Sequence, residues 1–95
     1  MPAYVIVEID VHDPKGHEAY SQTAPSTLDT FGGKLIARGG EMAVLEGDWQ
    51  PKRIVMAEFP DLDTAKRWYA SDAYQAAKEL REHTATLQMV AVDGM

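Results

Sequence analysis

Arg38 is the first side chain in this 95-residue sequence with a clear chemical use. It ends a short apolar segment and precedes Gly39-Gly40, where a backbone without side chains lets a ligand approach closely. A guanidinium there could hold a carboxylate or an enolate through two parallel hydrogen bonds. The alternative is an arginine at the rim of a sheet that pairs with a nearby acid, as arginines often do. Arg38 is therefore a candidate anion-binding and catalytic residue.

Glu8 and Glu58 are the second candidates, and each lies in an apolar segment with the pattern of a strand. We expect these first and third strands to be parallel neighbours, which would bring both carboxylates near one end and onto one face. Two close carboxylates raise the pKa of one of them, and this produces a general acid–base group at neutral pH. The alternative is that both carboxylates reach solvent or pair with Arg38. The predicted catalytic set is Arg38, Glu8 and Glu58.

Four aromatic residues at helical spacing are candidates for lining a ligand pocket between helices and sheet: Tyr20, Trp68, Tyr69 and Tyr74. Their hydroxyl and indole groups could donate hydrogen bonds to a ligand. Aromatic side chains at this spacing are more often core residues, so a structural role is the alternative.

The sequence offers no recognisable metal site. It contains no cysteine, and its three histidines, His12, His17 and His83, are dispersed. His12 and His17 fall on either side of a predicted strand-to-helix turn, which does not favour a shared metal. Ser71 has no evident His–Asp partners and fits a helix cap. We therefore expect neither a metal nor haem, and no other cofactor.

Composition narrows the class of partner and the expected location. The net charge of −6 argues against nucleic acid, because phosphate binding needs a basic surface and the nine Lys and Arg residues are scattered. No apolar run approaches the roughly 20 residues that cross a bilayer, and the first residues lack the basic region of a signal peptide. We expect a single domain, residues 1–95, in the cytoplasm.

The hydrophobic pattern predicts how these residues are positioned. Apolar alternation and β-branched runs predict strands at residues 4–11, 34–38, 54–59 and 86–92. Residues 41–46 should continue the second strand beyond a bulge at Gly39-Gly40. Asp13 and Asp61 are predicted N-caps of two helical segments, the first broken near Pro25 and ended by Gly32-Gly33. The second should restart at Ser71, with Ala73, Ala76, Ala77 and Leu80 buried.

The order βαββαβ predicts an α+β, ferredoxin-like fold with an antiparallel sheet and both helical segments on one face. The other face would expose Tyr4, Ile6, Ile54 and Met56, joined by Leu87 or Val90. Each such side chain left in water forgoes about 1.5–3 kcal/mol of burial. Uncovered apolar faces of this kind mark interfaces. We therefore expect a homodimer with the two sheets face to face.

Four segments together carry a family resemblance: GGKLIARGG at 32–40, VLEG at 44–47, RIVMAEFP at 53–60 and WYASDAY at 68–74. They resemble the short bacterial proteins grouped as domain of unknown function 1330, over essentially the whole chain. The resemblance implies the dimeric α/β-barrel superfamily, in which two ferredoxin-like subunits close a barrel. That superfamily includes cofactor-free monooxygenases, haem-degrading enzymes, lactone isomerases and non-catalytic binding proteins.

The monooxygenase and haem-degrading relatives typically use an early asparagine with a tryptophan and sometimes a histidine. This chain contains no asparagine, so that constellation does not carry over. The leading hypothesis is a dimer that binds a small organic acid or an aromatic metabolite and catalyses cofactor-free proton transfer or oxygenation. The alternative is a non-catalytic dimer that binds a ligand or only assembles.

Overall fold

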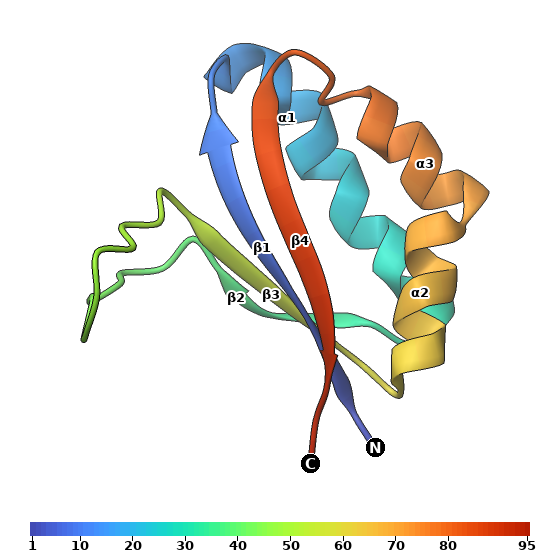
Figure 1. Ribbon diagram of the computed structural model, residues 1–95. Coiled ribbons are helices and arrows are strands. Elements are labelled where there is room, and N and C mark those ends of the chain that lie inside the picture. The colour runs from blue at the N-terminus through green and yellow to red at the C-terminus, as the bar shows by residue number, and fades with distance from the viewer.

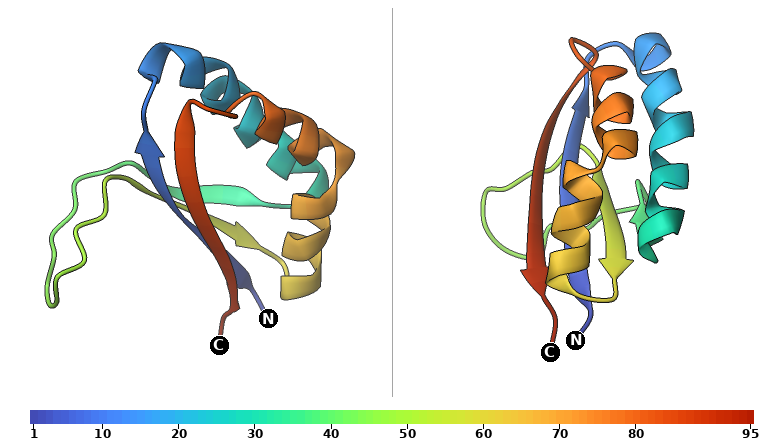
Figure 2. Two further views of the ribbon diagram at one scale, coloured as in Figure 1. Left: turned by 45° about the horizontal axis from the view of Figure 1, so that its top comes forward. Right: turned by 90° about the vertical axis from the view of Figure 1, so that its right-hand side faces the viewer.

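The computed structural model describes all residues, 1–95, as one antiparallel sheet with helices packed on one face (Figures 1 and 2). The strands lie in the order β2-β3-β1-β4. Their bounds are β1 Ala3–Val11, β2 Lys34–Arg38, β3 Ile54–Phe59 and β4 Ala85–Asp93. This confirms the α+β, ferredoxin-like fold with an antiparallel sheet.

One expectation about the sheet is wrong: β1 and β3 are neighbours but run antiparallel, with Ile6 opposite Met56. The helical crossover returns β2 in the direction of β1. The reversal between β2 and β3 then makes β3, which is inserted between them, run the opposite way.

The first helical segment is broken where the proline predicts it. Asp13 caps α1 (Pro14–Thr23) by accepting a hydrogen bond from the Gly16 backbone N–H at 3.0 Å. Beyond it the chain tightens into the 3₁₀ helix η1 (Ala24–Phe31), because Pro25 cannot donate a helical backbone bond. Gly32 ends η1 in the left-handed conformation, at φ 68°.

The second helical segment contains α2 (Leu62–Ala70) and α3 (Asp72–Glu79). Asp61 caps α2 by accepting from the Thr64 N–H at 2.7 Å, and Ser71 caps α3 through the Tyr74 N–H at 3.2 Å. The predicted buried stripe of α3 is partly wrong: Tyr74 and Ala77 are buried, whereas Ala73, Ala76 and Leu80 are exposed. Burying a tyrosine ring removes far more apolar surface from water than burying alanines does.

The segment between β2 and β3, residues 39–53, contains no strand. It projects from the sheet on the side away from the helices (Figures 1 and 2). The predicted extension of β2 over residues 41–46 is therefore wrong, and the irregularity in β2 lies between Leu35 and Ala37, before Gly39-Gly40.

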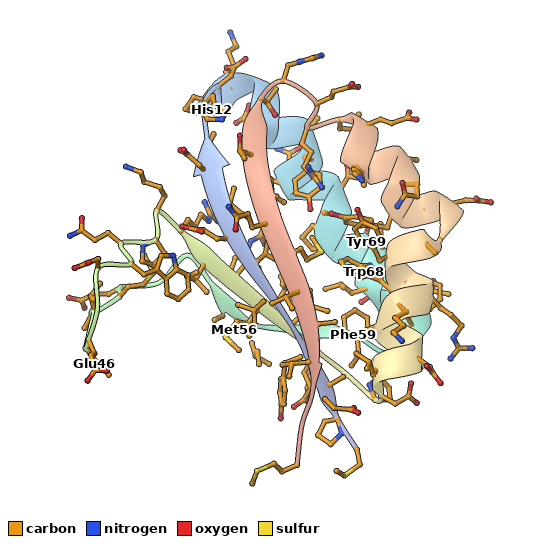
Figure 3. The ribbon with its side chains drawn as sticks, in the orientation of Figure 1. His12, Glu46, Met56, Phe59, Trp68 and Tyr69 are labelled. Atoms are coloured by element: carbon orange, nitrogen blue, oxygen red, sulfur yellow. The ribbon has the colours of Figure 1, made fainter.

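The two faces of the sheet differ as the alternation predicts. One face packs against the helices and forms the core with Val5, Val7, Ile9, Ala57 and Phe59. The other face carries Tyr4, Ile6, Ile54, Met56 and Val90, and no helix covers it; Figure 3 shows Met56 on that side. Val90 is 58% exposed, while Leu87 packs toward the core. No helix has the length and apolar character needed to cross a membrane.

Candidate functional site

A cavity of about 70 Å³ lies between the sheet and the segment formed by α1 and η1. Its walls are mostly apolar, and five polar or ionisable side chains interrupt them: His17, Tyr20, Ser21, Arg38 and Arg53. We call it the inner cavity. It combines a mainly apolar wall with several hydrogen-bonding groups, as ligand pockets do.

His17 lies on α1 and is buried, with its ring centroid 5.3 Å from that of Tyr20. Its Nδ1 atom is buried without a hydrogen-bond partner. Burial lowers the pKa of His17 below the ordinary 6.5, and the charges of Arg53 and Arg81 lower it further. His17 is therefore a neutral imidazole at neutral pH, able to accept a proton.

Arg53 directly precedes β3, and its Nε atom is also buried without a hydrogen-bond partner. Its guanidinium packs over Gly39, where an added Cβ would lie 2.7 Å from that Nε. Gly39 also has a φ of 66°, which favours glycine. The glycine after Arg38 therefore makes room for a second arginine at the same cavity.

Arg38 lies at the end of β2 and joins this strand to α1. Its Nη2 donates to the Ser21 backbone carbonyl at 2.8 Å and to Ser21 Oγ at 3.3 Å. The side chain is exposed on one side and lines the inner cavity on the other. Part of its fork is used by Ser21, and the remaining N–H groups are available to a ligand.

The four predicted aromatic residues divide among different surroundings. Tyr20 and Trp68 line the inner cavity, and Tyr69 lines a separate groove. Tyr74 is fully buried in the core, where its hydroxyl lies 2.9 Å from that of Tyr20. Burial and this contact raise the pKa of Tyr20, so Tyr20 stays a neutral phenol. The Trp68 indole N–H donates to Thr27 Oγ1 at 2.9 Å.

The predicted convergence of Glu8 and Glu58 with Arg38 is wrong. Glu58 lies opposite Tyr4 and Glu8 opposite Ile54, so four residues, or about 14 Å, separate them along the strands. Glu58 pairs with Lys34 at 3.3 Å, and Glu8 accepts from Trp49 Nε1 at 3.4 Å.

Both glutamates are on the open face, whereas Arg38 lies opposite Val55 on the helix face. The antiparallel pairing separates the two acids along the strands. The irregularity in β2 turns Arg38 to the other side of the sheet.

His17 and Arg53 are the cavity residues that the sequence analysis missed, although a signal existed for both. His17 precedes Tyr20 by three residues, so the buried stripe of the helix extends back to it. Arg53 alternates with Val55, Ala57 and Phe59 and therefore belongs to the buried face of β3.

The arrangement presents two guanidinium groups and a neutral imidazole to one small enclosure. Such a set can hold an anion and accept a proton from it. No group of three His, Asp or Glu side chains gathers to hold a metal ion, and the expectation of a protein without metal or haem stays a prediction.

Comparison with known proteins gives one family match and several similar structures. Residues 2–95 match the model of a family described as Domain of unknown function (DUF1330). The RPA0582 protein of unknown function from Rhodopseudomonas palustris has a TM-score of 0.77 at 15% identity, over 99% of this chain and 82% of that chain. A comparison with curated proteins finds no match.

Two further structures are similar over nearly the whole chain. SnoaB, a cofactor-independent oxygenase from Streptomyces nogalater, has a TM-score of 0.67 at 14% identity, over 99% of this chain and 93% of that chain. A dimeric ferredoxin-like protein of unknown function from Jannaschia sp. CCS1 has a TM-score of 0.69 at 10% identity, over 99% and 100% of the two chains. At these identities the likeness establishes the fold alone.

Proposed function

This chain belongs to the DUF1330 family, and from that premise we propose that it is a homodimeric protein that binds a small organic acid in the inner cavity. Arg38 and Arg53 hold the anion, and His17 moves a proton on it. Dimerisation is supported by the uncovered apolar sheet face and by the dimeric ferredoxin-like neighbours.

The observation that carries the proposal is the pair of buried nitrogens without partners, His17 Nδ1 and Arg53 Nε, on residues that line one cavity. An unpaired buried polar group costs about 1–3 kcal/mol, and native proteins keep few of them. The oxygen atoms of a carboxylate ligand supply acceptors to Arg53 Nε–H and, in the tautomer that carries its proton on Nδ1, to His17 Nδ1–H. Both costs then become binding energy for that ligand.

The size of the inner cavity favours a small acid over an aromatic metabolite. At about 70 Å³ it has roughly half the volume of a cavity of ~150 Å³ that holds benzene. A 2-oxo acid such as pyruvate is smaller than an aromatic acid, and its carboxylate matches an arginine fork.

The proton transfer needs no oxidant and no cofactor. The neutral imidazole of His17 accepts a proton from the carbon next to the ligand carbonyl, and the C–H electron pair becomes the C=C bond of an enolate. The charge on the enolate oxygen is stabilised by a guanidinium. The imidazolium then returns the proton to carbon or to oxygen, which completes exchange or tautomerisation.

A non-catalytic binding protein is the second candidate. It is favoured by the engagement of Arg38 with Ser21 and by the distance of both glutamates from the inner cavity. Oxygenation has less support, because the likeness to SnoaB is limited to the fold and this chain has no asparagine.

The first test is thermal denaturation with formate, acetate, pyruvate, 2-oxobutyrate and benzoate. At ten times its Kd, a ligand stabilises by about 1.4 kcal/mol, or several degrees for a domain of this size. Pyruvate or 2-oxobutyrate should stabilise most, and Arg53→Lys and Arg38→Ala should reduce the shift. Arg67→Ala, which removes an exposed charge on α2, is the matched control. Equal shifts in Arg53→Lys and Arg67→Ala would refute the binding site.

The second test separates the two candidates. In D₂O, wild-type protein should accelerate deuterium incorporation at the methyl group of pyruvate, followed by proton NMR. His17→Gln should still bind pyruvate but lose this acceleration. Binding without acceleration by the wild-type protein would favour the non-catalytic candidate.

A further inference from the structure

A second hollow of about 460 Å³ lies on the helix side of the sheet and involves α2, the end of α3 and β4. We call it the α2–β4 groove. Figure 3 shows Trp68 and Tyr69 between α2 and the sheet, and both side chains line the groove. Its floor and walls are mostly apolar, its charged side chains are all cationic, and no acid lines it. The complete lining is Val5, Ala65, Lys66, Trp68, Tyr69, Lys78, Arg81, Leu87, Met89 and Ala91.

The three cations of the groove form no ion pairs, although the chain has a net charge of −6. Lys78 Nζ donates to the Tyr69 hydroxyl at 2.7 Å and lies 5.1 Å from the centre of that ring. The Arg81 guanidinium lies 5.4 Å from the centre of the Tyr20 ring, and its Nε is buried without a hydrogen-bond partner. Aromatic contacts orient two of these cations, and no carboxylate neutralises them.

We propose that the α2–β4 groove binds an amphipathic organic anion, a monocarboxylate with an aliphatic chain or a ring. The apolar part lies along Leu87, Met89 and Ala91, and the carboxylate accepts hydrogen bonds from Lys78 and Arg81. The volume falls in the range of pockets for ligands larger than pyruvate. This site shares a wall of Val5, Trp68 and Met89 with the inner cavity, but its cations are different ones and it does not depend on the proposed function.

Charge and position favour this occupant over a macromolecule. Three cations are too few for nucleic acid on an acidic chain. A second copy of the chain is expected on the opposite, open face of the sheet. A copy seated in the groove would bring acidic surface residues, not one carboxylate attached to an apolar chain of the size of the groove. The carboxylate of one such ligand accepts from Lys78 and Arg81, while its apolar part covers the floor of the groove.

The test uses Trp68 as a reporter. Trp49→Phe removes the other tryptophan, which lies in the exposed segment between β2 and β3. Octanoate should then change the fluorescence of Trp68 saturably. Octanol has the same chain without the charge, and acetate has the charge without the chain, so both should bind at least tenfold more weakly.

Variants locate the charge that matters. In the Trp49→Phe background, Lys78→Gln should weaken octanoate binding about tenfold, the effect of one charge-assisted hydrogen bond. Lys52→Gln removes the same charge from the exposed segment and should have no effect. Arg53→Lys should leave octanoate binding unchanged, and Lys78→Gln should leave pyruvate binding unchanged. Failure of this proposal is thereby distinguishable from failure of the inner cavity.

Three results would overturn the proposal. One is equal octanoate affinity in Lys78→Gln and Lys52→Gln. Another is octanol binding as tightly as octanoate, which would reduce the groove to an apolar surface. The third is a Trp68 fluorescence that changes with the protein concentration and does not change with the octanoate concentration. That result would assign the groove to a second copy of the chain.

Discussion

The buried hydrogen bond between Thr27 and Trp68 allows a quantitative test of how the wall of both hollows is held. Trp68 lines the inner cavity and the α2–β4 groove, and its indole N–H donates to Thr27 Oγ1 at 2.9 Å. The same hydroxyl donates to the Ala24 carbonyl at 2.6 Å. Thr27→Val keeps the shape of the side chain and removes both bonds.

The expected cost follows from what is left unpaired. Indole N–H is a donor only, and Trp68 is buried, so the unpaired group costs about 1–3 kcal/mol. For a domain of this size, each kcal/mol lowers Tm by about 4–8 °C, so Tm should fall by roughly 4–24 °C. Trp68→Phe removes the donor as well, so the double variant should be more stable than the sum of the single losses predicts.

Urea unfolding of the wild type, both single variants and the double variant measures this coupling. Thr30→Val makes the same chemical change at an exposed position of η1 and should cost little. The reasoning is refuted if Thr27→Val costs no more than Thr30→Val, or if the losses of Thr27→Val and Trp68→Phe simply add.

Three further predictions concern the pH dependence, the arginine pair and the dimer. Because the folded pKa of His17 lies below the ordinary 6.5, the unfolded state binds more protons between these values, and stability should fall as pH drops below 6.5. Urea unfolding at several pH values in that window should show that the unfolding free energy of His17→Gln depends less steeply on pH than that of the wild type. An unchanged pH dependence would contradict the burial of this imidazole. Gly39→Ala should displace Arg53 and weaken pyruvate binding, measured by calorimetry. Gly40→Ala is the control, because nothing lies within 4 Å of its added Cβ. Equal pyruvate affinities of the two variants would show that Gly39 makes no room for Arg53. Ile54→Asp on the open face should give a monomer by light scattering at micromolar concentration, whereas Leu45→Asp, at a side chain 93% exposed, should stay dimeric. A monomeric wild type would remove the argument from the uncovered face.

Much of the fold follows from local features of the sequence. The caps Asp13, Asp61 and Ser71 work over three residues, and Pro25 and Gly32 change the backbone where they stand. The alternation in β1 separates a buried face from an open one without reference to the rest of the chain. These elements were predicted because their causes lie within a few residues.

The candidate site depended on pairings that local patterns do not contain. Simple alternation from Lys34 would put Arg38 on the open face opposite Ile54, but the irregularity between Leu35 and Ala37 turns it to the helix face. Glu8 and Glu58 are separated because the hairpin reverses β3 relative to β1. Conversely, the buried periodicities already included His17 and Arg53, and the polar character of these two side chains concealed them.

The central claim is that one small acid gives His17 and Arg53 the partners they lack. The most direct measurement is nitrogen-15 NMR of the histidine rings and arginine Nε–H groups during titration with pyruvate and 2-oxobutyrate. The resonances of His17 Nδ1 and Arg53 Nε should shift together with one saturation curve, while Arg67 Nε stays in place. If Arg53 and His17 do not respond to either acid, or respond no more than Arg67, the inner cavity is not the binding site.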